Sequence, residues 1–244
     1  MIIKQAMVLA AGLGTRMRPI TETMPKPLVR IGGKPMIDYV LDALIEAGVE
    51  TVAVNVHHHA DQMETHLATA TRAKIRISDE RERLMDSGGG LVKGLKLLDP
   101  DKPALVMNAD LFWVGERDDE PSNLVRLAQQ FDPSRMDMAM LCVEQERTTG
   151  HNGKNDFSMA DDGRLTRYVP GAPNPVVYAG ALALMPHLFD DAPDGPFNLN
   201  IYFDRAIAAG RLFGTDLDGQ WLTVGTPDAI APAEAVVARY GGGR

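Results

Sequence analysis

The sequence is poor in cysteine and in net positive charge. It has one cysteine, Cys142, among 244 residues, which excludes an intramolecular disulfide and fits a reducing compartment. This thiol lies in an apolar run, so we expect a buried core residue rather than a nucleophile. The formal net charge is −8, and the missing basic excess argues against nonspecific binding of nucleic acid.

Long apolar runs are also missing. No uninterrupted apolar stretch approaches the roughly 20 residues that a membrane-spanning helix needs. The first residues, Met1-Ile2-Ile3-Lys4, lack the charged region and the long apolar region of a signal peptide. We therefore expect a cytoplasmic protein that has no membrane partner.

Two familiar phosphate-binding motifs are absent from the glycine-rich stretch near the start of the chain. The dinucleotide fingerprint needs a third glycine where this sequence has Met17. The P-loop needs Gly-Lys followed by Ser or Thr, which this loop does not contain. By itself, a Gly-x-Gly pair is also compatible with an ordinary turn between a strand and a helix.

The glycine-rich stretch nevertheless gathers groups that bind anions. An apolar run at residues 6–10 predicts a buried parallel strand, and a loop containing Gly12 and Gly14 follows it. Successive free N–H groups in such a loop form a concavity that binds anions. Arg16, Arg18 and Lys26 add positive charge to the same rim. In an acidic protein, this local positive charge predicts a site for a polyphosphate.

The rest of the chain reads as alternating strands and helices. Apolar residues at helical spacing follow Pro35, and Gly48 ends that helix before a second strand at residues 52–56. This order predicts a right-handed βαβ unit and a parallel sheet. Further strands are expected at 75–78, 104–108, 137–143, 176–184 and 212–217, and further helices at about 62–69, 91–98, 122–131, 197–209 and 228–240.

Two segments beside these elements are informative. Asp110 follows the strand at 104–108, so it should lie at the same sheet edge as the glycine loop, because ligands bind at the carboxyl ends of parallel strands. The triple glycine at residues 88–90 opens a helix, which is costly unless something approaches the backbone there. A flexible helix entry is the alternative. The charged segment at residues 79–83 is expected to be mostly a solvent-exposed loop.

The long pattern Leu-Ala-Ala-Gly-x-Gly-Thr-Arg-Met-Arg-Pro, followed by Pro-Lys-Pro-Leu, closely resembles the sugar-phosphate nucleotidyltransferase family. The resemblance covers about residues 3–239. It implies an α/β, Rossmann-like three-layer fold with a mixed, mostly parallel central sheet, forming a single domain over residues 1–244. The nucleotide-binding half would span about residues 1–112 and the sugar-phosphate-binding half about residues 113–240.

The resemblance also implies roles for particular residues. Arg16, Lys26 and Asp110 would be catalytic, and Asp110 would bind Mg²⁺. A second ligand of the family falls at Thr223, whose neutral hydroxyl is a poor Mg²⁺ ligand. The implied nucleotide-binding residues are Leu9, Ala10, Ala11, Gly12, Gly14, Thr15, Arg16, Lys26, Ser87, Gly88, Gly89 and Asn108. The implied sugar-phosphate-binding residues are Asn155, Asp156, Tyr178, Gly180 and Asn198.

The reaction implied is transfer of a nucleoside monophosphate from a nucleoside triphosphate to a sugar 1-phosphate. The triple glycine resembles that of uridylyltransferases acting on N-acetylmuramate 1-phosphate in peptidoglycan recycling. Mannose 1-phosphate guanylyltransferases are an alternative. A nucleotide-binding regulatory protein without turnover is an alternative of another class, favoured only by Thr223. The partners would be the two substrates, with no nucleic acid, and the chain would be a monomer or a small homo-oligomer.

Overall fold

A nine-stranded mixed sheet forms the centre of the molecule. The computed structural model describes residues 1–241. Residues 1–112 contribute four parallel strands in the order β6-β1-β4-β5. They are β1 (Gln5–Leu9), β4 (Thr51–Val56), β5 (Lys74–Asp79) and β6 (Ala104–Asn108). The side chains of β1 are buried on both faces, as expected for a parallel strand between two helical layers.

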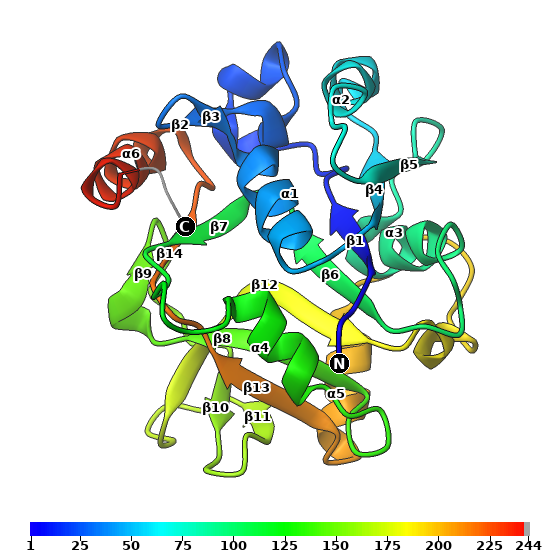
Figure 1. Ribbon diagram of the computed structural model, residues 1–244, viewed down its shortest axis with the longest axis vertical. Coiled ribbons are helices and arrows are strands. Elements are labelled where there is room, and N and C mark those ends of the chain that lie inside the picture. Colours follow the sequence, from blue (N-terminus) through cyan, green and yellow to red (C-terminus); the bar gives the residue numbers. More distant parts are fainter. Residues whose placement is uncertain (242–244) are drawn as a thin grey trace.

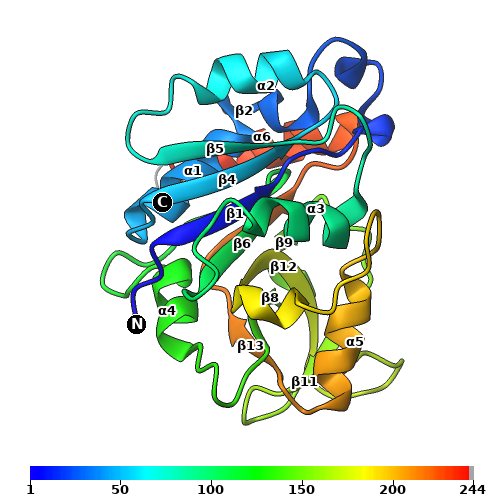
Figure 2. The same cartoon turned by 90° about the vertical axis from the view of Figure 1, so that its right-hand side faces the viewer.

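Helices cover both faces of the sheet. α1 (Met36–Glu46), α2 (Ala60–Leu67) and α4 (Asn123–Gln130) pack their apolar side chains into one buried cluster on the first face. α3 (Asp86–Leu95) and α5 (Asn200–Ala208) contribute to a second cluster on the opposite face. Figure 1 shows α1 and α4 in front of the strands, and Figure 2 shows α3 and α5 on the other side of them. This arrangement confirms the predicted three-layer fold.

The other half of the sheet is mostly antiparallel. β12 (Pro175–Leu184) pairs antiparallel with β6, β8 (Met138–Val143) and β10 (Phe157–Met159), while β11 (Leu165–Arg167) extends the edge. β13 (Leu212–Asp216) runs parallel to β8. The register of β12 shifts between Tyr178 and Leu182, where Gly180 has a φ of 73°. A Cβ on Gly180 would lie 2.3 Å from Leu111 Cδ2, so this bulge needs glycine.

A small second sheet was not predicted from the sequence. It contains β7 (Leu111–Val114), β14 (Gln220–Thr223) and β9 (Thr148–Thr149), and α6 (Ile230–Arg239) packs over it. β7 follows β6 after only two residues, and no turn motif separates the two strands in the sequence. A hairpin of β2 (Arg30–Ile31) and β3 (Lys34–Pro35) also lies within residues 1–112.

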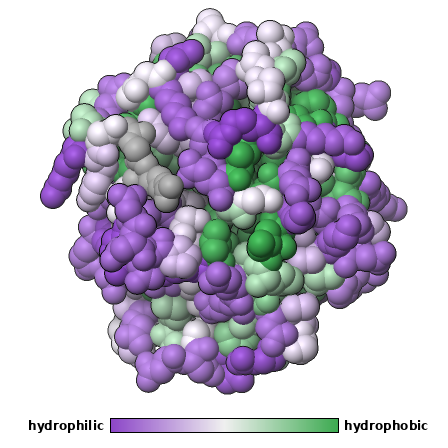
Figure 3. Space-filling view, in the orientation of Figure 1, coloured by the Kyte–Doolittle hydropathy of each residue, from purple (hydrophilic) through white to green (hydrophobic). Residues whose placement is uncertain are grey.

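Most of the molecule's visible surface is hydrophilic. Figure 3 shows charged and polar side chains over this face, with apolar side chains gathered near its centre. Within residues 1–241, none of the helices has the length and apolarity needed to cross a bilayer. The thiol of Cys142 is buried in β8, as expected, and burial raises its pKa well above the ordinary value.

Candidate active site

A cavity of about 300 Å³ opens where the parallel strands β1, β4 and β6 end. This is the sheet edge at which ligands bind in open α/β folds. The cavity is lined by Leu9, Ala10, Ala11, Gly12, Lys26, Pro27, Asn55, Glu80, Leu84, Asp86, Ser87, Asn108, Ala109 and Asp110. The structure therefore brings together residues from five separate stretches of sequence, including most of the predicted nucleotide site.

The glycine loop contains one residue in a conformation that favours glycine. Gly14 adopts a left-handed conformation with a φ of 61°, and a Cβ there would lie 2.9 Å from Thr21 Cγ2. The hydroxyl of Thr21 donates a hydrogen bond to the Gly14 carbonyl at 2.8 Å. Gly12 lies in open space, where no protein atom would approach a Cβ within 4 Å. The loop thus leaves room above Gly12 for a ligand.

Lys26 and Asp110 form an ion pair at the floor of this cavity. Lys26 Nζ donates to Asp110 Oδ2 at 2.5 Å, and the exposed fractions of the two side chains are 10% and 37%. Pro25 and Pro27 flank Lys26 and restrict its backbone, which fixes the origin of the side chain. Nothing within residues 1–241 donates a hydrogen bond to Asp110 Oδ1. A cationic group and a partly free carboxylate oxygen are therefore placed side by side.

Arg16 and Thr223 lie near this pair without lining the cavity. The guanidinium of Arg16 lies beside Gly225, where a Cβ would be 3.5 Å from Arg16 Nη1. Thr223 pairs with Leu111 in the small sheet, and the next residue, Val224, donates to the Asp110 carbonyl at 3.4 Å. The small sheet therefore brings the late segment at residues 223–225 to the same edge as the glycine loop. Gly14 and Thr15, which directly precede Arg16, do not line the cavity either.

The triple glycine lies inside α3 and faces protein rather than the cavity. Gly88 and Gly89 donate their N–H groups to the Phe197 carbonyl at 2.9 and 3.3 Å. A Cβ on Gly88 would meet the Phe197 ring at 2.2 Å. These contacts give the glycines a packing role, and binding of nucleotide by Gly88 and Gly89 stays a prediction. Ser87, one residue earlier, lines the cavity.

A buried polar pair that the sequence did not reveal connects two walls of the cavity. Asn55 Oδ1 accepts a hydrogen bond from Ala10 N at 2.6 Å, and Asn55 Nδ2 donates to Glu80 Oε1 at 2.7 Å. The second carboxylate oxygen of Glu80 accepts from Met85 N at 3.0 Å. Glu80 is 1% exposed, so the prediction of a solvent-exposed loop is wrong for this residue. The cause is that both of its oxygens are paired inside the protein.

A second cavity, of about 220 Å³, shares the walls Leu9, Ser87 and Asn108 with the first. Its other lining residues come from the antiparallel half and from α5. They are Asp156, Phe157, Arg167, Tyr178, Asn198, Leu199, Asn200 and Phe203. The predicted sugar-phosphate residues Asp156, Tyr178 and Asn198 therefore meet in one cavity that adjoins the first cavity.

Two other predicted sugar-phosphate residues do not line this cavity. Gly180 forms the bulge of β12, and the side-chain oxygen of Asn155 is buried without a hydrogen-bond partner. Sequence reasoning missed Arg167 and Asn200, which carried no motif. Asp156 Oδ2 accepts a hydrogen bond from Tyr178 N at 2.9 Å. Burial is the main cause that raises the pKa of Tyr178, so its hydroxyl stays protonated at neutral pH.

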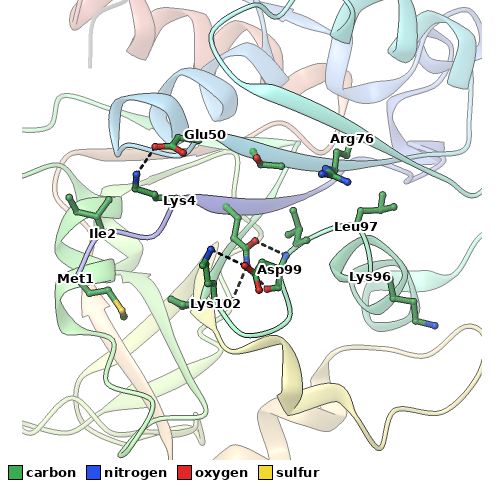
Figure 4. A pocket seen from close by; sticks show the side chains of 13 residues that line it. Met1, Ile2, Lys4, Glu50, Arg76, Lys96, Leu97, Asp99 and Lys102 are labelled. Atoms are coloured by element: carbon green, nitrogen blue, oxygen red, sulfur yellow. Dashed lines mark hydrogen bonds and ion pairs between the residues drawn. The ribbon is translucent and has the colours of Figure 1, made fainter.

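A further cavity, of about 620 Å³, lies at the opposite edge of the sheet, where β1 and β4 begin. Figure 4 shows two pairs of its charged side chains turned toward each other: Lys4 toward Glu50, and Lys102 toward Asp99. The N–O distances within these ion pairs are 2.7 and 2.9 Å. None of the predicted site residues lines this cavity.

Comparisons with known proteins agree with this geometry. A family model described as nucleotidyl transferase matches residues 5–169. The chain is 40% identical to N-acetylmuramate alpha-1-phosphate uridylyltransferase of Caulobacter vibrioides, over 96% of this chain and 97% of that protein. The protein of the same name from Neisseria meningitidis is 30% identical, over 97% and 99% of the two chains.

Similarity to solved structures supports the fold. The inositol-1-phosphate CTP transferase from T. maritima superposes with a TM-score of 0.79. The superposition covers 98% of this chain and 97% of that chain, at 13% sequence identity. Because the identity is low, this similarity bears on the architecture alone.

Proposed function

The chain belongs to the nucleotidyl transferase family, and from this premise we propose that it transfers UMP from UTP to N-acetylmuramate α-1-phosphate. The products would be UDP-N-acetylmuramate and pyrophosphate. The observation that carries the proposal is the pair of adjoining cavities, one beside the glycine loop and the Lys26–Asp110 pair, the other lined by polar side chains. The similarity to uridylyltransferases over nearly the whole chain supports the choice of substrates.

The proposed reaction depends more on stabilising the negative charge of the phosphates than on a general base that would deprotonate the nucleophile. A phosphate oxygen of the sugar phosphate forms a bond to the α-phosphorus, and the bond from that phosphorus to the bridging oxygen breaks as pyrophosphate leaves. The second pKa of a phosphate monoester is about 6, so the nucleophile is already largely ionised at pH 7. Lys26 would stabilise charge between the α-phosphate and the incoming phosphate, and Arg16 would bind the outer phosphates. This requirement fits a site whose floor carries a nearly buried ammonium group.

Asp110 has the properties needed to help hold a divalent cation. Enzymes of this family generally use one, and we propose Mg²⁺ here. The carboxylate is partly exposed, and Oδ1 accepts no hydrogen bond from the described residues. Mg²⁺ often binds through one or two carboxylates together with substrate phosphates, so Asp110 alone is compatible with it. When bound, the ion would neutralise charge on the phosphate oxygens.

The direct test is pyrophosphate release by the purified protein. UTP, GTP, CTP and ATP would each be combined with N-acetylmuramate, N-acetylglucosamine and mannose 1-phosphates. We expect the highest kcat/KM with UTP and N-acetylmuramate α-1-phosphate. A preference for GTP and mannose 1-phosphate would reassign the enzyme to the guanylyltransferases. Nucleotide binding without turnover on any sugar phosphate would favour a regulatory protein.

A further inference from the structure

Arg167 is a cation that lines the second cavity, of about 220 Å³, which we call the sugar-side cavity. Contacts within the protein hold its guanidinium in place. It ends β11, at the edge of the antiparallel half. Its Nε donates to Asp204 Oδ1 and its Nη2 to Asn200 Oδ1, each at 2.8 Å. The guanidinium carbon lies 4.9 Å from the centre of the Phe157 ring. Two hydrogen bonds and one aromatic face therefore fix the plane of the guanidinium before any ligand binds.

This arrangement leaves part of the guanidinium available. Arginine carries five N–H donors. The two N–H groups at Nη1 donate to no acceptor within residues 1–241, and the side chain is 37% exposed. The guanidinium is therefore held through Nε and Nη2, while the Nη1 donors have no acceptor within residues 1–241. Arginine N–H groups of this kind are suited to a planar anion such as a carboxylate.

The position of Arg167 separates it from the reacting phosphates. Of the two adjoining cavities, Lys26 and Asp110 line only the one beside the glycine loop, which we call the nucleotide cavity. Arg167 lines only the sugar-side cavity. The sugar 1-phosphate must place its phosphate next to Lys26 in order to react. Its phosphate end would therefore point away from Arg167, and Arg167 would contact a substituent at the other end of the sugar.

We propose that Arg167 binds a carboxylate on the sugar and thereby selects an acidic sugar 1-phosphate. This inference rests on the proposed function. N-Acetylmuramate carries such a carboxylate on its lactyl ether, whereas N-acetylglucosamine has a hydroxyl group in its place. Among the residues that the structure describes, Arg167 is the one cation lining this cavity.

The other charges around the cavity set the orientation of the acidic group. Asp156 lines the same cavity and repels an anion, but its carboxylate can accept hydrogen bonds from sugar hydroxyls. Asp204 neutralises part of the Arg167 charge, yet it is 62% exposed and well solvated. The carboxylate of the substrate would therefore lie on the Arg167 side of the cavity, with sugar hydroxyls toward Asp156.

The test compares two substrates that differ only in the lactyl group. We would measure kcat/KM for N-acetylmuramate and N-acetylglucosamine α-1-phosphates with UTP, in the wild type and in Arg167→Gln. The ratio of the acidic to the neutral substrate should fall about 10- to 100-fold in the variant, as expected for loss of a charge-assisted hydrogen bond. Equal losses with both substrates would overturn the proposal, because they would mean that Arg167 binds a group common to both.

Two controls keep the result interpretable. Arg164→Gln removes a nearby arginine that pairs with Asp162 and does not line the cavity, so the substrate ratio should keep its wild-type value. Arg167→Lys keeps the positive charge but lacks the paired N–H groups of the guanidinium. Its ratio of kcat/KM for the acidic to the neutral substrate should fall less than the ratio of Arg167→Gln. Thermal melting of each variant shows whether it folds.

A binding measurement separates this inference from the proposed function. Calorimetry of N-acetylmuramate α-1-phosphate with wild type and Arg167→Gln needs no turnover. At least tenfold weaker binding by the folded variant would support the role of Arg167 even if no nucleotide were transferred. Unchanged binding would contradict that role even if the wild type proved to be an active uridylyltransferase.

Discussion

The two cavities of the proposed site differ in the groups that form them. The nucleotide cavity uses backbone from the glycine loop together with the Lys26–Asp110 pair at the ends of parallel strands. The sugar-side cavity uses side chains from β10, β11, β12 and α5, spread over residues 156–203. Backbone N–H groups suit phosphates, which every nucleotide carries, whereas side chains can be chosen to fit one sugar. From this comparison we propose that the first cavity carries the reaction and that the second provides much of the sugar selectivity.

The largest effect is expected at Asp110. Asp110→Asn should lower kcat about 10³-fold, because it removes the carboxylate beside Lys26 whose Oδ1 accepts no hydrogen bond from the described residues and could hold a divalent cation. A steady-state assay at saturating substrates and several Mg²⁺ concentrations measures this loss. Asp101→Asn, which removes an exposed carboxylate away from the cavity, is the matched control. A folded Asp110→Asn protein with near wild-type turnover would remove Asp110 from the metal site.

A somewhat smaller loss is expected at Lys26. Lys26→Ala should reduce kcat about 10²-fold, since a preorganised charge at the reacting phosphates would be missing. Stability should change little, because the remaining Asp110 carboxylate is partly exposed and can be hydrated. Kinetics and thermal melts would be compared with Lys34→Ala, a lysine paired with Asp42 elsewhere. Wild-type turnover in folded Lys26→Ala would show that the nucleotide half stabilises the reaction by other means.

The next effect concerns the buried pair behind the cavity wall. In Glu80→Gln, an NH₂ group replaces one of the two carboxylate oxygens, and this group cannot accept a hydrogen bond. Either the bond from Asn55 Nδ2 or the bond from Met85 N is therefore lost. We expect KM for UTP to rise about tenfold. In the double variant Asn55→Asp/Glu80→Gln, every hydrogen bond from Ala10 to Met85 can form again with the donors reversed.

The double variant should therefore recover most of the affinity for UTP, measured by KM and by calorimetry. Ser78→Ala is the matched control, because this buried hydroxyl two residues before Glu80 has no hydrogen-bond partner among the described residues. If the double variant is no better than the worse single variant, the pair does not position the cavity wall through these hydrogen bonds.

The smallest effect is expected at Thr223, which the small sheet brings next to Asp110. A carboxylate binds Mg²⁺ better than a hydroxyl, so Thr223→Asp should lower the Mg²⁺ concentration for half-maximal rate a few-fold. A Mg²⁺ titration of the initial rate measures this shift, and Thr226→Asp, directly after the late segment, serves as a comparison. An unchanged requirement would mean that residue 223 does not reach the metal.

The sequence was informative where a local pattern determines structure. The apolar run before Gly12, the helix ended by Gly48 and the position of Asp110 after β6 all followed from local patterns, and the structure has them. Glu80 could not be recognised, because it lies among charged residues that are exposed and only the fold pairs it with Asn55. β7 was missed because it starts only two residues after β6 ends, with no turn motif between the two strands.

The sugar half was harder to predict for a physical reason. Arg167 and Asn200 are 33 positions apart and meet only because β11 packs beside α5. No spacing rule within either element reports such a contact. The resemblance to a family gave Asp156, Tyr178 and Asn198, which share this cavity, whereas Gly180 and Asn155 lie outside its lining.

The central claim is that the two halves select the two substrates separately, and a four-protein comparison tests it most directly. KM for UTP and for N-acetylmuramate α-1-phosphate would be measured in wild type, Glu80→Gln, Arg167→Gln and the double variant. The account predicts that Glu80→Gln raises mainly the KM for UTP and Arg167→Gln mainly the KM for the sugar phosphate, with both increases present together in the double variant. Equal increases of both KM values in each single variant would contradict it.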